Sequence, residues 1–269
     1  TLSLHDALPI CVRPSGTCET PDVNKVRVGF FSFTEITDPS AHRSYNEWHQ
    51  LDHMPEQFPL TGLAYGQRWV STPACRAARA VSAESLDPIH YVTLYLMTEP
   101  VDTTLREFYA LGGDLRALGR FHSQRRSHLA GPTRFLEAHA AARTLVSAES
   151  VPYRPHRGVH VLVETPAVAD EAYLQWWHTD HAPALCALDG VAGTWSFATS
   201  TNFGHLPWWT PGNRRVTVTW IDGDVLETNA RIEALDAARR ERWATTTTTE
   251  FAGPFETITP WQWDWFDEA

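Results

Sequence analysis

The sequence predicts an α+β fold made of two copies of a β-α-β-β-α-β unit, and two internal repeats are the main reason. Residues 45–67, YNEWHQLDHMPEQFPLTGLAYGQ, recur as residues 173–195, YLQWWHTDHAPALCALDGVAGTW, at a constant shift of 128. A shorter repeat, LAGP at 129–132 and FAGP at 251–254, follows at a shift of 122. Both repeats occur in the same order in each half, and two ordered repeats are not expected by chance. We interpret the chain as an internal duplication.

The longer repeat has the pattern of an amphipathic helix. One face of that helix in the first copy carries Tyr45, Trp48, His49, Asp52 and Glu56, with His53 at its edge. The same face in the second copy carries Tyr173, Trp176, Trp177 and Asp180, with His181 at its edge. Pro55 and Pro183 follow the two histidines by two positions, and a proline inside a helix removes a backbone hydrogen bond. We therefore expect each histidine in the last regular turn or at a kink.

The other elements of the first half complete a ferredoxin-like order. Strand patterns cover residues 26–33, 63–70, 89–97 and 134–140. The repeat helix has a cap and a start at 38–40, and a second helix is expected over about 103–118, where Gly112 and Gly113 form a weak point. Residues 73–88 read as a polar, alanine-rich insertion. The first module is thus predicted at 23–146.

The second half repeats this order, and its module is predicted at 157–269. Its first three strands are expected at 158–164, 191–199 and 215–221, and its helices at about 169–185 and 225–244. Gly62 and Gly190 each supply the permissive backbone for the turn before a strand. Residues 141–156 are interpreted as the linker between the modules.

The first residues of the chain are excluded from the fold prediction. Residues 1–10, TLSLHDALPI, coincide with the translation of a common sequencing-library adapter, and the chain does not begin with methionine. We interpret them as a read-through artefact, and residues 11–22 as being of doubtful origin. A disordered tail over 1–22 leads to the same fold prediction.

Composition narrows the class of protein. The chain has 269 residues with 43% hydrophobic and 20% charged residues, which is typical of a globular protein, and it contains no apolar run long enough to span a membrane. A net charge of −10 argues against nucleic-acid binding, because proteins that bind phosphates usually carry a clustered basic face. We interpret the one basic cluster, at 116–126, as the solvated end of a helix. Four cysteines without CxxC spacing favour a reducing compartment, so we expect a soluble cytoplasmic protein.

The repeat resembles a known family. W-x-x-x-(D/E)-H-x-P followed by a glycine turn is similar to the motif of the EthD-like branch of the dimeric α/β-barrel superfamily. Trp177, His181 and Pro183 match its W-x-x-x-H-x-P form directly, whereas the first copy has His49 where the second has Trp177. The resemblance covers both halves from about residue 25 onward. It implies that the two modules form a pseudo-dimeric α/β barrel, with a pocket between the helices and the sheet of each module.

Candidate site residues come from the repeat and from the third strand. An imidazole exchanges a proton near neutral pH, and a tyrosine can donate a hydrogen bond to a carbonyl or enolate. The candidate catalytic residues are His53, His181 and Tyr45. The candidate substrate-binding residues are Trp48, His49, Tyr91, Tyr95, Trp176 and Trp177. The alternative is structural: each histidine bonds a carbonyl or carboxylate at a helix end, and each tyrosine packs in the core.

No cofactor or metal is expected. His49 and His53 are four residues apart and His178 and His181 are three apart, so each pair could face one metal, but the sequence places no third ligand. The two pairs also do not correspond under the repeat. Haem lacks an identifiable axial position, and no phosphate loop or nucleophile elbow occurs.

The resemblance implies an enzyme that works by acid/base chemistry without a cofactor. Its class would be an isomerase, cyclase, dehydratase or monooxygenase that acts on a small apolar carbonyl, lactone or polyphenolic compound. The rival hypothesis is a non-catalytic ligand-binding or assembly module of the same fold. The first half keeps more polar surroundings around its histidine, so we expect it to hold the working site. The duplication allows a monomer, with a homodimer as the alternative.

Overall fold

A computed structural model describes residues 24–166, 171–199 and 213–267 of the protein. The predicted tail at 1–22 and the first two residues of the helix predicted at 169–185 lie outside the described residues. None of the helices within the described ranges is long and apolar enough to cross a membrane.

The first half has the predicted order of elements. Its four main strands are β1 (Val26–Ile36), β2 (Leu63–Val70), β4 (Tyr91–Thr98) and β5 (Arg125–Ala140). Between β1 and β2 lie η1 (Pro39–Ala41), α1 (His42–Trp48), η2 (His49–His53) and α2 (Met54–Gln57). The helix α4 (Val101–Ala117) connects β4 to β5. Asp38 caps the first helical segment, because its side chain accepts a hydrogen bond from the backbone N–H of Ser40.

The second half has the same order. Its strands are β6 (Gly158–Pro166), β7 (Val191–Ala198), β8 (Arg215–Ile221) and β9 (Thr247–Thr257). Its helices are α5 (Glu171–Trp176), η5 (Trp177–His181), α6 (Ala182–Ala187) and α7 (Val225–Arg242). The chain therefore contains two ferredoxin-like modules. The predicted linker holds two short helices, η3 (Ala142–Thr144) and η4 (Ala148–Tyr153).

The strands of both modules belong to one antiparallel sheet, in the order β2-β4-β1-β5-β7-β8-β6-β9 with the short β3 (Val81–Ser82) beside β9. Strands β5 and β7 pair across the two halves. Strand β2 also pairs with β9, through Trp69 with Thr257 and Val70 with Glu256. This last pairing joins the two ends of the order, so each of the eight long strands has a neighbour on both sides. The fold class predicted from the sequence, a pseudo-dimeric α/β barrel, is confirmed.

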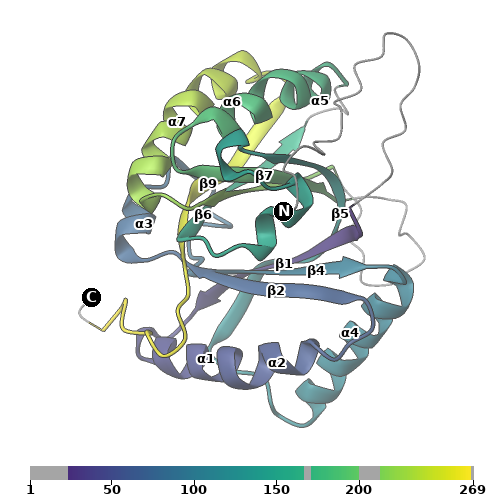
Figure 1. The fold of residues 1–269 in the computed structure, drawn as a ribbon. Helices are drawn as coiled ribbons and strands as arrows, with labels where there is room; N and C mark the ends of the chain where they lie inside the picture. Colours follow the sequence, from purple (N-terminus) through teal and green to yellow (C-terminus); the bar gives the residue numbers. More distant parts are fainter. Residues whose placement is uncertain (1–23, 167–170, 200–212, 268–269) are drawn as a thin grey trace, which may run out of the picture.

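Successive side chains along each strand point to opposite faces of the sheet, so one face packs in a core shared by both halves and the other packs against helices. One set of side chains, including Phe31, Trp69, Leu94, Trp195 and Phe251, forms a single buried apolar cluster drawn from strands of both halves. The opposite faces of the strands carry the helices. In Figure 1, α1, α2 and α4 lie below the strands, and α5, α6 and α7 lie above them. Each half therefore has its own interface between helices and sheet.

Long-range pairing makes some elements longer than the local sequence pattern predicts. Strand β5 was expected to begin at residue 134 but begins at Arg125, because its first part pairs with β1 and its last part with β7. The repeated LAGP and FAGP segments lie inside β5 and β9. The insertion at 73–88 supplies α3 (Pro73–Ala77) and β3, which pairs with β9.

The C-terminal segment crosses from the second half to the first. Trp263 is only 4% exposed and packs with Tyr45 and Tyr91 of the first half. The Phe266 ring stacks on His42, with ring centroids 3.9 Å apart. Trp261, in contrast, is 70% exposed. The segment therefore packs against the first module.

Candidate functional site

A wide helical turn positions the histidine of each repeat. In η2, the N–H of Met54 donates to the carbonyl of His49, five residues back, which makes this segment π-helical. In η5, the N–H of Ala182 donates to the carbonyl of Trp177 in the same way. Pro55 and Pro183 come directly afterwards and lack an N–H for a regular turn. His53 and His181 therefore sit at the distortion that the prolines predict.

A cavity of about 510 Å³ lies between the helices and the sheet of the first half. Its apolar walls include Phe30, Phe108, Tyr109 and Phe121. His49 and His53 line it from η2, and Tyr95 lines it from β4. Cavities of this size hold small molecules in many proteins.

Two glycines of α4 help to make the space. Gly112 and Gly113 both line the cavity, and a Cβ added at either position would meet no atom within 4 Å. A helix interior usually avoids glycine, because glycine costs about 1 kcal/mol relative to alanine there. The pair that the sequence marked as a weak point in the helix is thus a stretch of cavity wall without side chains.

Both cavity histidines are held neutral at pH 7. Burial, and then the positive charge of Arg125, lower the pKa of His53 to about 4. Burial and the charge of Arg68 lower the pKa of His49 well below its ordinary value. The His53 ring stacks on Trp48, with centroids 4.6 Å apart and planes 15° apart. A neutral, fixed imidazole can accept a proton or a hydrogen bond from a ligand.

The cavity wall also holds several buried polar atoms that no described residue bonds. They are the Nδ1 atoms of His49 and His53, Oε1 of Gln57, Oγ1 of Thr93 and the hydroxyl of Tyr95. Burial raises the pKa of Tyr95, so its phenol stays protonated and can donate a hydrogen bond. A buried polar atom without a partner costs stability, and such atoms in native proteins call for an explanation. A polar ligand in the cavity would explain all five.

The charge at the cavity is positive. Arg116 and Arg125 line it, and their guanidinium groups each lie 5.2 Å from the centre of the Phe121 ring. No aspartate or glutamate is among the lining residues. Among the described residues, neither arginine forms a salt bridge. The cavity is therefore suited to a ligand with an anionic group.

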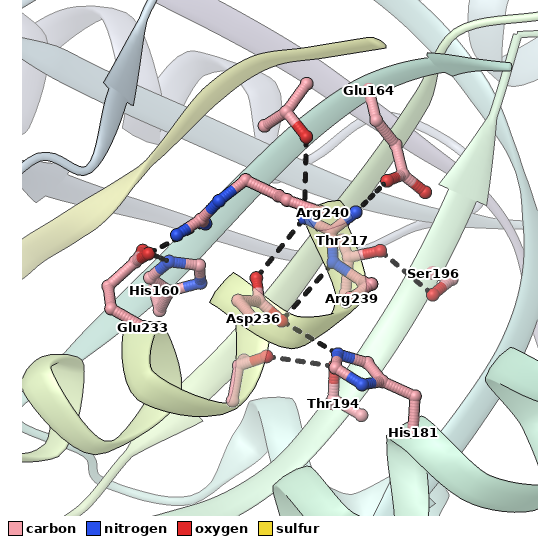
Figure 2. Close-up of polar contacts among 12 residues, drawn as sticks. His160, Glu164, His181, Thr194, Ser196, Thr217, Glu233, Asp236, Arg239 and Arg240 are labelled. Atoms are coloured by element: carbon pink, nitrogen blue, oxygen red, sulfur yellow. Dashed lines mark hydrogen bonds and ion pairs between the residues drawn. The ribbon is translucent and has the colours of Figure 1, made fainter. Parts of the chain in front are cut away.

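The matching region of the second half is filled by a network of charged side chains (Figure 2). His181 Nε2 lies 2.8 Å from Asp236 Oδ1, and both side chains are 2% exposed. Arg239 bonds Glu164 at 2.7 Å, and the Tyr173 hydroxyl donates to Glu164 at 2.7 Å. Burial acts to raise the pKa of Asp236, but the His181 hydrogen bond and the Arg239 charge outweigh it and lower that pKa. His181 is thus paired with a carboxylate of the protein itself.

The two second helices can be placed in register through a pair of threonines. A Cβ added at Gly62 would lie 2.3 Å from Thr104 Oγ1, and one added at Gly190 would lie 2.2 Å from Thr228 Oγ1. Both glycines have positive φ. Matching Thr104 to Thr228 places Gly112 opposite Asp236. The partner of His181 therefore corresponds to a glycine beside His53.

The remaining predicted site residues lie away from the cavity. Tyr45 is fully buried, and the Arg68 guanidinium lies over its ring. The Tyr91 hydroxyl is hydrogen-bonded to the His42 ring and accepts a hydrogen bond from the Asn46 side-chain amide. Trp48 stacks on the His53 ring and donates its N–H to the carbonyl of Arg120. Trp176 and Trp177 pack in the apolar cluster of the second half. Of the nine predicted residues, the cavity brings together His49, His53 and Tyr95.

Sequence reasoning did not identify several cavity residues. They are Gln57, Thr93, Phe108, Gly112, Arg116 and Arg125. One signal was available: aligning the second helices of the two halves at Thr104 and Thr228 would have set Gly112 against Asp236. The acidic residues of the first repeat lie outside the cavity: Asp52 pairs with Arg120, as does Glu56 at 2.6 Å.

Comparison with known proteins identifies the fold. No protein-family model matches the chain, and no curated protein matches it. A solved structure provisionally named a chlorite dismutase matches with TM-score 0.53 and 10% identity, over 90% of this chain and 98% of that one. An anthrone oxidase-like protein matches with TM-score 0.50 and 11% identity, over 88% and 93%. A provisionally named monooxygenase from Fusobacterium nucleatum matches with TM-score 0.50 and 7% identity, over 88% and 94%. At these identities the likeness shows a shared fold across almost the whole chain.

Proposed function

We propose that the first half of the chain is an acid/base active site without a bound cofactor, of the EthD-like type. The observation that carries this proposal is the cavity of about 510 Å³ beside the neutral His53, lined by buried polar atoms without protein partners. A cavity of this kind supports a catalytic site over a solidly packed module. The second half would then be mainly structural, because its histidine already has a partner.

The substrate that fits best is a small aromatic carbonyl or polyphenolic compound with an ionisable group. Aromatic rings on the walls favour a flat apolar body. The Tyr95 hydroxyl can donate to a carbonyl or enolate oxygen, and Arg125 can stabilise the negative charge that develops there. Proton abstraction next to such a carbonyl is the first step of an isomerase, a cyclase or a dehydratase.

His53 is the proposed general base. Its free Nδ1 is buried and its imidazole is neutral at pH 7, so it can accept a proton from a bound substrate. Its pKa of about 4 makes it a weak base in the free protein. A ligand anion beside it would offset the charge of Arg125 and raise that pKa toward neutrality. Substrate binding would thereby improve the base.

Oxygenation is included in the proposed reaction class. A deprotonated phenol or enolate is electron-rich and can itself reduce dioxygen, so the protein only needs to bind and deprotonate the substrate. Two of the structural neighbours are named an anthrone oxidase-like protein and a monooxygenase. Anthrone, a flat aromatic ketone that ionises at its enol, is therefore the first probe to test.

A non-catalytic ligand-binding module is the second candidate, and the low pKa of His53 favours it. A histidine with a pKa of about 4 is a poor base unless the ligand raises that value. The same cavity could then bind an aromatic acid without changing it. Turnover of the probe, as opposed to binding alone, separates the two candidates.

The test compares the two histidines of the repeat with anthrone as the probe. We expect His53→Ala to lower anthrone conversion by about a hundredfold or more, the usual scale for losing a general base, with little change in melting temperature. His181→Ala should affect conversion less and stability more, because it leaves Asp236 without that partner. Conversion would be followed by absorbance and binding by fluorescence quenching. Binding without conversion would favour the non-catalytic module, and the reverse ranking would move the site to the second half.

A further inference from the structure

A second cluster of chemically active side chains lies where the two modules meet, away from the cavity. Glu137 and His139 lie on β5, the last strand of the first module, and His178 lies on η5 of the second. In this region β5 pairs with β7, with Glu137 opposite Ser196 and His139 opposite Thr194. The cluster therefore depends on the pairing between the two modules.

The geometry brings three ligand atoms together. Glu137 and His139 are two residues apart on one strand, so their side chains leave the same face. His178 Nδ1 lies 2.6 Å and His139 Nε2 lies 3.1 Å from the same oxygen, Oε2 of Glu137. All three possible ligand atoms lie within 4.8 Å of one another. Ligands around one tetrahedral ion with bonds of about 2.0–2.1 Å lie about 3.3 Å apart. His139 is already close to this separation from Glu137, and the exposed His178 side chain would need to move outward by less than about 1 Å.

The chemistry of the three groups fits a zinc-type cation. Two imidazole nitrogens and one carboxylate oxygen form a common set for divalent transition metals. The His178 side chain is 63% exposed, which gives an ion a path from solvent and leaves one side open for water.

We propose that Glu137, His139 and His178 bind a divalent transition-metal ion of the zinc class at the junction of the two modules. This site revises the expectation that the chain binds no metal, and it does not use the histidine pairs that the sequence suggested. His178 points to β5 and away from its neighbour His181, which bonds Asp236. An ion held here would tie η5 to β5 and so stabilise the seam between the modules.

The experiment uses the untagged full-length chain with Zn²⁺ and Co²⁺ as probes. Zn²⁺ affinity is measured by competition with a chromophoric chelator, and Co²⁺ binding by its visible absorption. We expect micromolar or tighter Zn²⁺ binding with one ion per chain, and Co²⁺ bands typical of nitrogen and oxygen ligands. His139→Ala, His178→Ala and Glu137→Gln should each weaken Zn²⁺ binding by about tenfold to a hundredfold or more.

A matched control is available in the first module. His128 lies 2.8 Å from Glu35, and these two side chains are 15% and 19% exposed, close to the 17% and 18% of His139 and Glu137. They lack a second histidine within the described residues. His128→Ala should leave Zn²⁺ binding unchanged. Retained binding in His139→Ala, or equal losses in His128→Ala, would overturn the proposal.

Stability supplies a second readout. A ligand that binds the folded state at a hundred times its Kd should raise the melting temperature by about 5–10 °C for a chain of this size. This rise should vanish in Glu137→Gln, which keeps the shape of the side chain. Millimolar binding in the wild type, or a Co²⁺–thiolate absorption band that assigns the ion to a cysteine, would refute the site. None of these outcomes depends on anthrone conversion, so the metal site and the proposed active site succeed or fail separately.

Discussion

The same repeat motif lies between the helices and the sheet in each half, but its histidine has different surroundings in the two halves. In the second half, His181 bonds Asp236, and Arg239 and Glu164 complete a buried network. In the first half, His53 has no protein partner for its Nδ1 among the described residues, and an open cavity lies beside it. A histidine that is paired with a buried carboxylate supports the fold, whereas one with an unpaired nitrogen beside a cavity can serve a ligand.

One pair of corresponding positions in α4 and α7 contributes directly to this difference. Asp236 fills the space and supplies a carboxylate, while Gly112 supplies neither volume nor charge. The cost to the first half is several buried polar atoms without partners. Residues at a functional site are often retained at such a cost to stability.

The largest expected effect is that mild acid destabilises the first half of the protein more than the second half. Burial is the largest cause that lowers the pKa of His42 and His53 to about 4 and of His90 to about 3, and all three lie in the first half. Their ordinary pKa is 6.5, so the unfolded chain binds protons first as the pH falls. Stability is fully present above pH 6.5 and is lost as the pH falls toward 4, on the order of several kcal/mol in total.

Native-state hydrogen exchange between pH 7 and pH 4.5 measures this effect. Amides of α1 and β4 should lose protection before those of α7. The Asp236 network should persist, because the lowered pKa of Asp236 keeps it ionised. Equal loss in both halves would contradict the comparison.

Breaking the second-half network should have the next largest effect. Asp236→Asn removes the negative charge that faces both His181 and Arg239, whose side chains are 2% and 1% exposed. Removing one partner of a buried ion pair usually costs about 3–5 kcal/mol. Urea unfolding should show this loss. Gly112→Ala, the matched change in the first half, should be neutral or stabilise by up to about 1 kcal/mol, because the added methyl group meets no atom.

Introducing an aspartate at the position in the first half that corresponds to Asp236 should block ligand binding in the cavity. In Gly112→Asp, the new side chain would enter the cavity and approach His53, raising the pKa of that histidine above its value of about 4. We expect the affinity for anthrone to fall by about tenfold or more, which is about 1.4 kcal/mol. Gly112→Asn separates the effect of volume from that of charge. NMR titration of His53 reports the pKa, and unchanged binding in Gly112→Asp would argue against this cavity as the ligand site.

The smallest effect is expected at the tyrosine of each repeat. The Tyr173 hydroxyl donates to Glu164, whereas the Tyr45 hydroxyl is buried without a partner among the described residues. Tyr173→Phe should cost about 1–2 kcal/mol, since it leaves the buried carboxylate short of a hydrogen bond. Tyr45→Phe should be neutral or slightly stabilising. Chemical denaturation of both variants provides the measurement, and equal costs would show that Tyr45 has a polar role.

Much of the fold could be predicted from the sequence, because the relevant signals are local. Helical spacing placed Tyr45 to Glu56 on one face, and Pro55 predicted the distortion at His53. The repeat gave both modules the same order of elements, which the structure has. The start of β5 at Arg125 was missed, since it is fixed by pairing with β1 and by no pattern of its own.

The order of elements, the two corresponding histidines and the class of fold could be read from the amino-acid sequence, since periodicity and turn residues act over a few positions. Which histidine is paired and which faces a cavity became known from the three-dimensional contacts, because the residues beside them lie on different helices, Asp236 on α7 and Gly112 on α4. The tertiary structure also brought His178 to Glu137 and His139, which are about forty residues away in the chain. A side chain's partners depend on contacts between distant segments, and for this reason the chemistry of this protein became visible only in three dimensions.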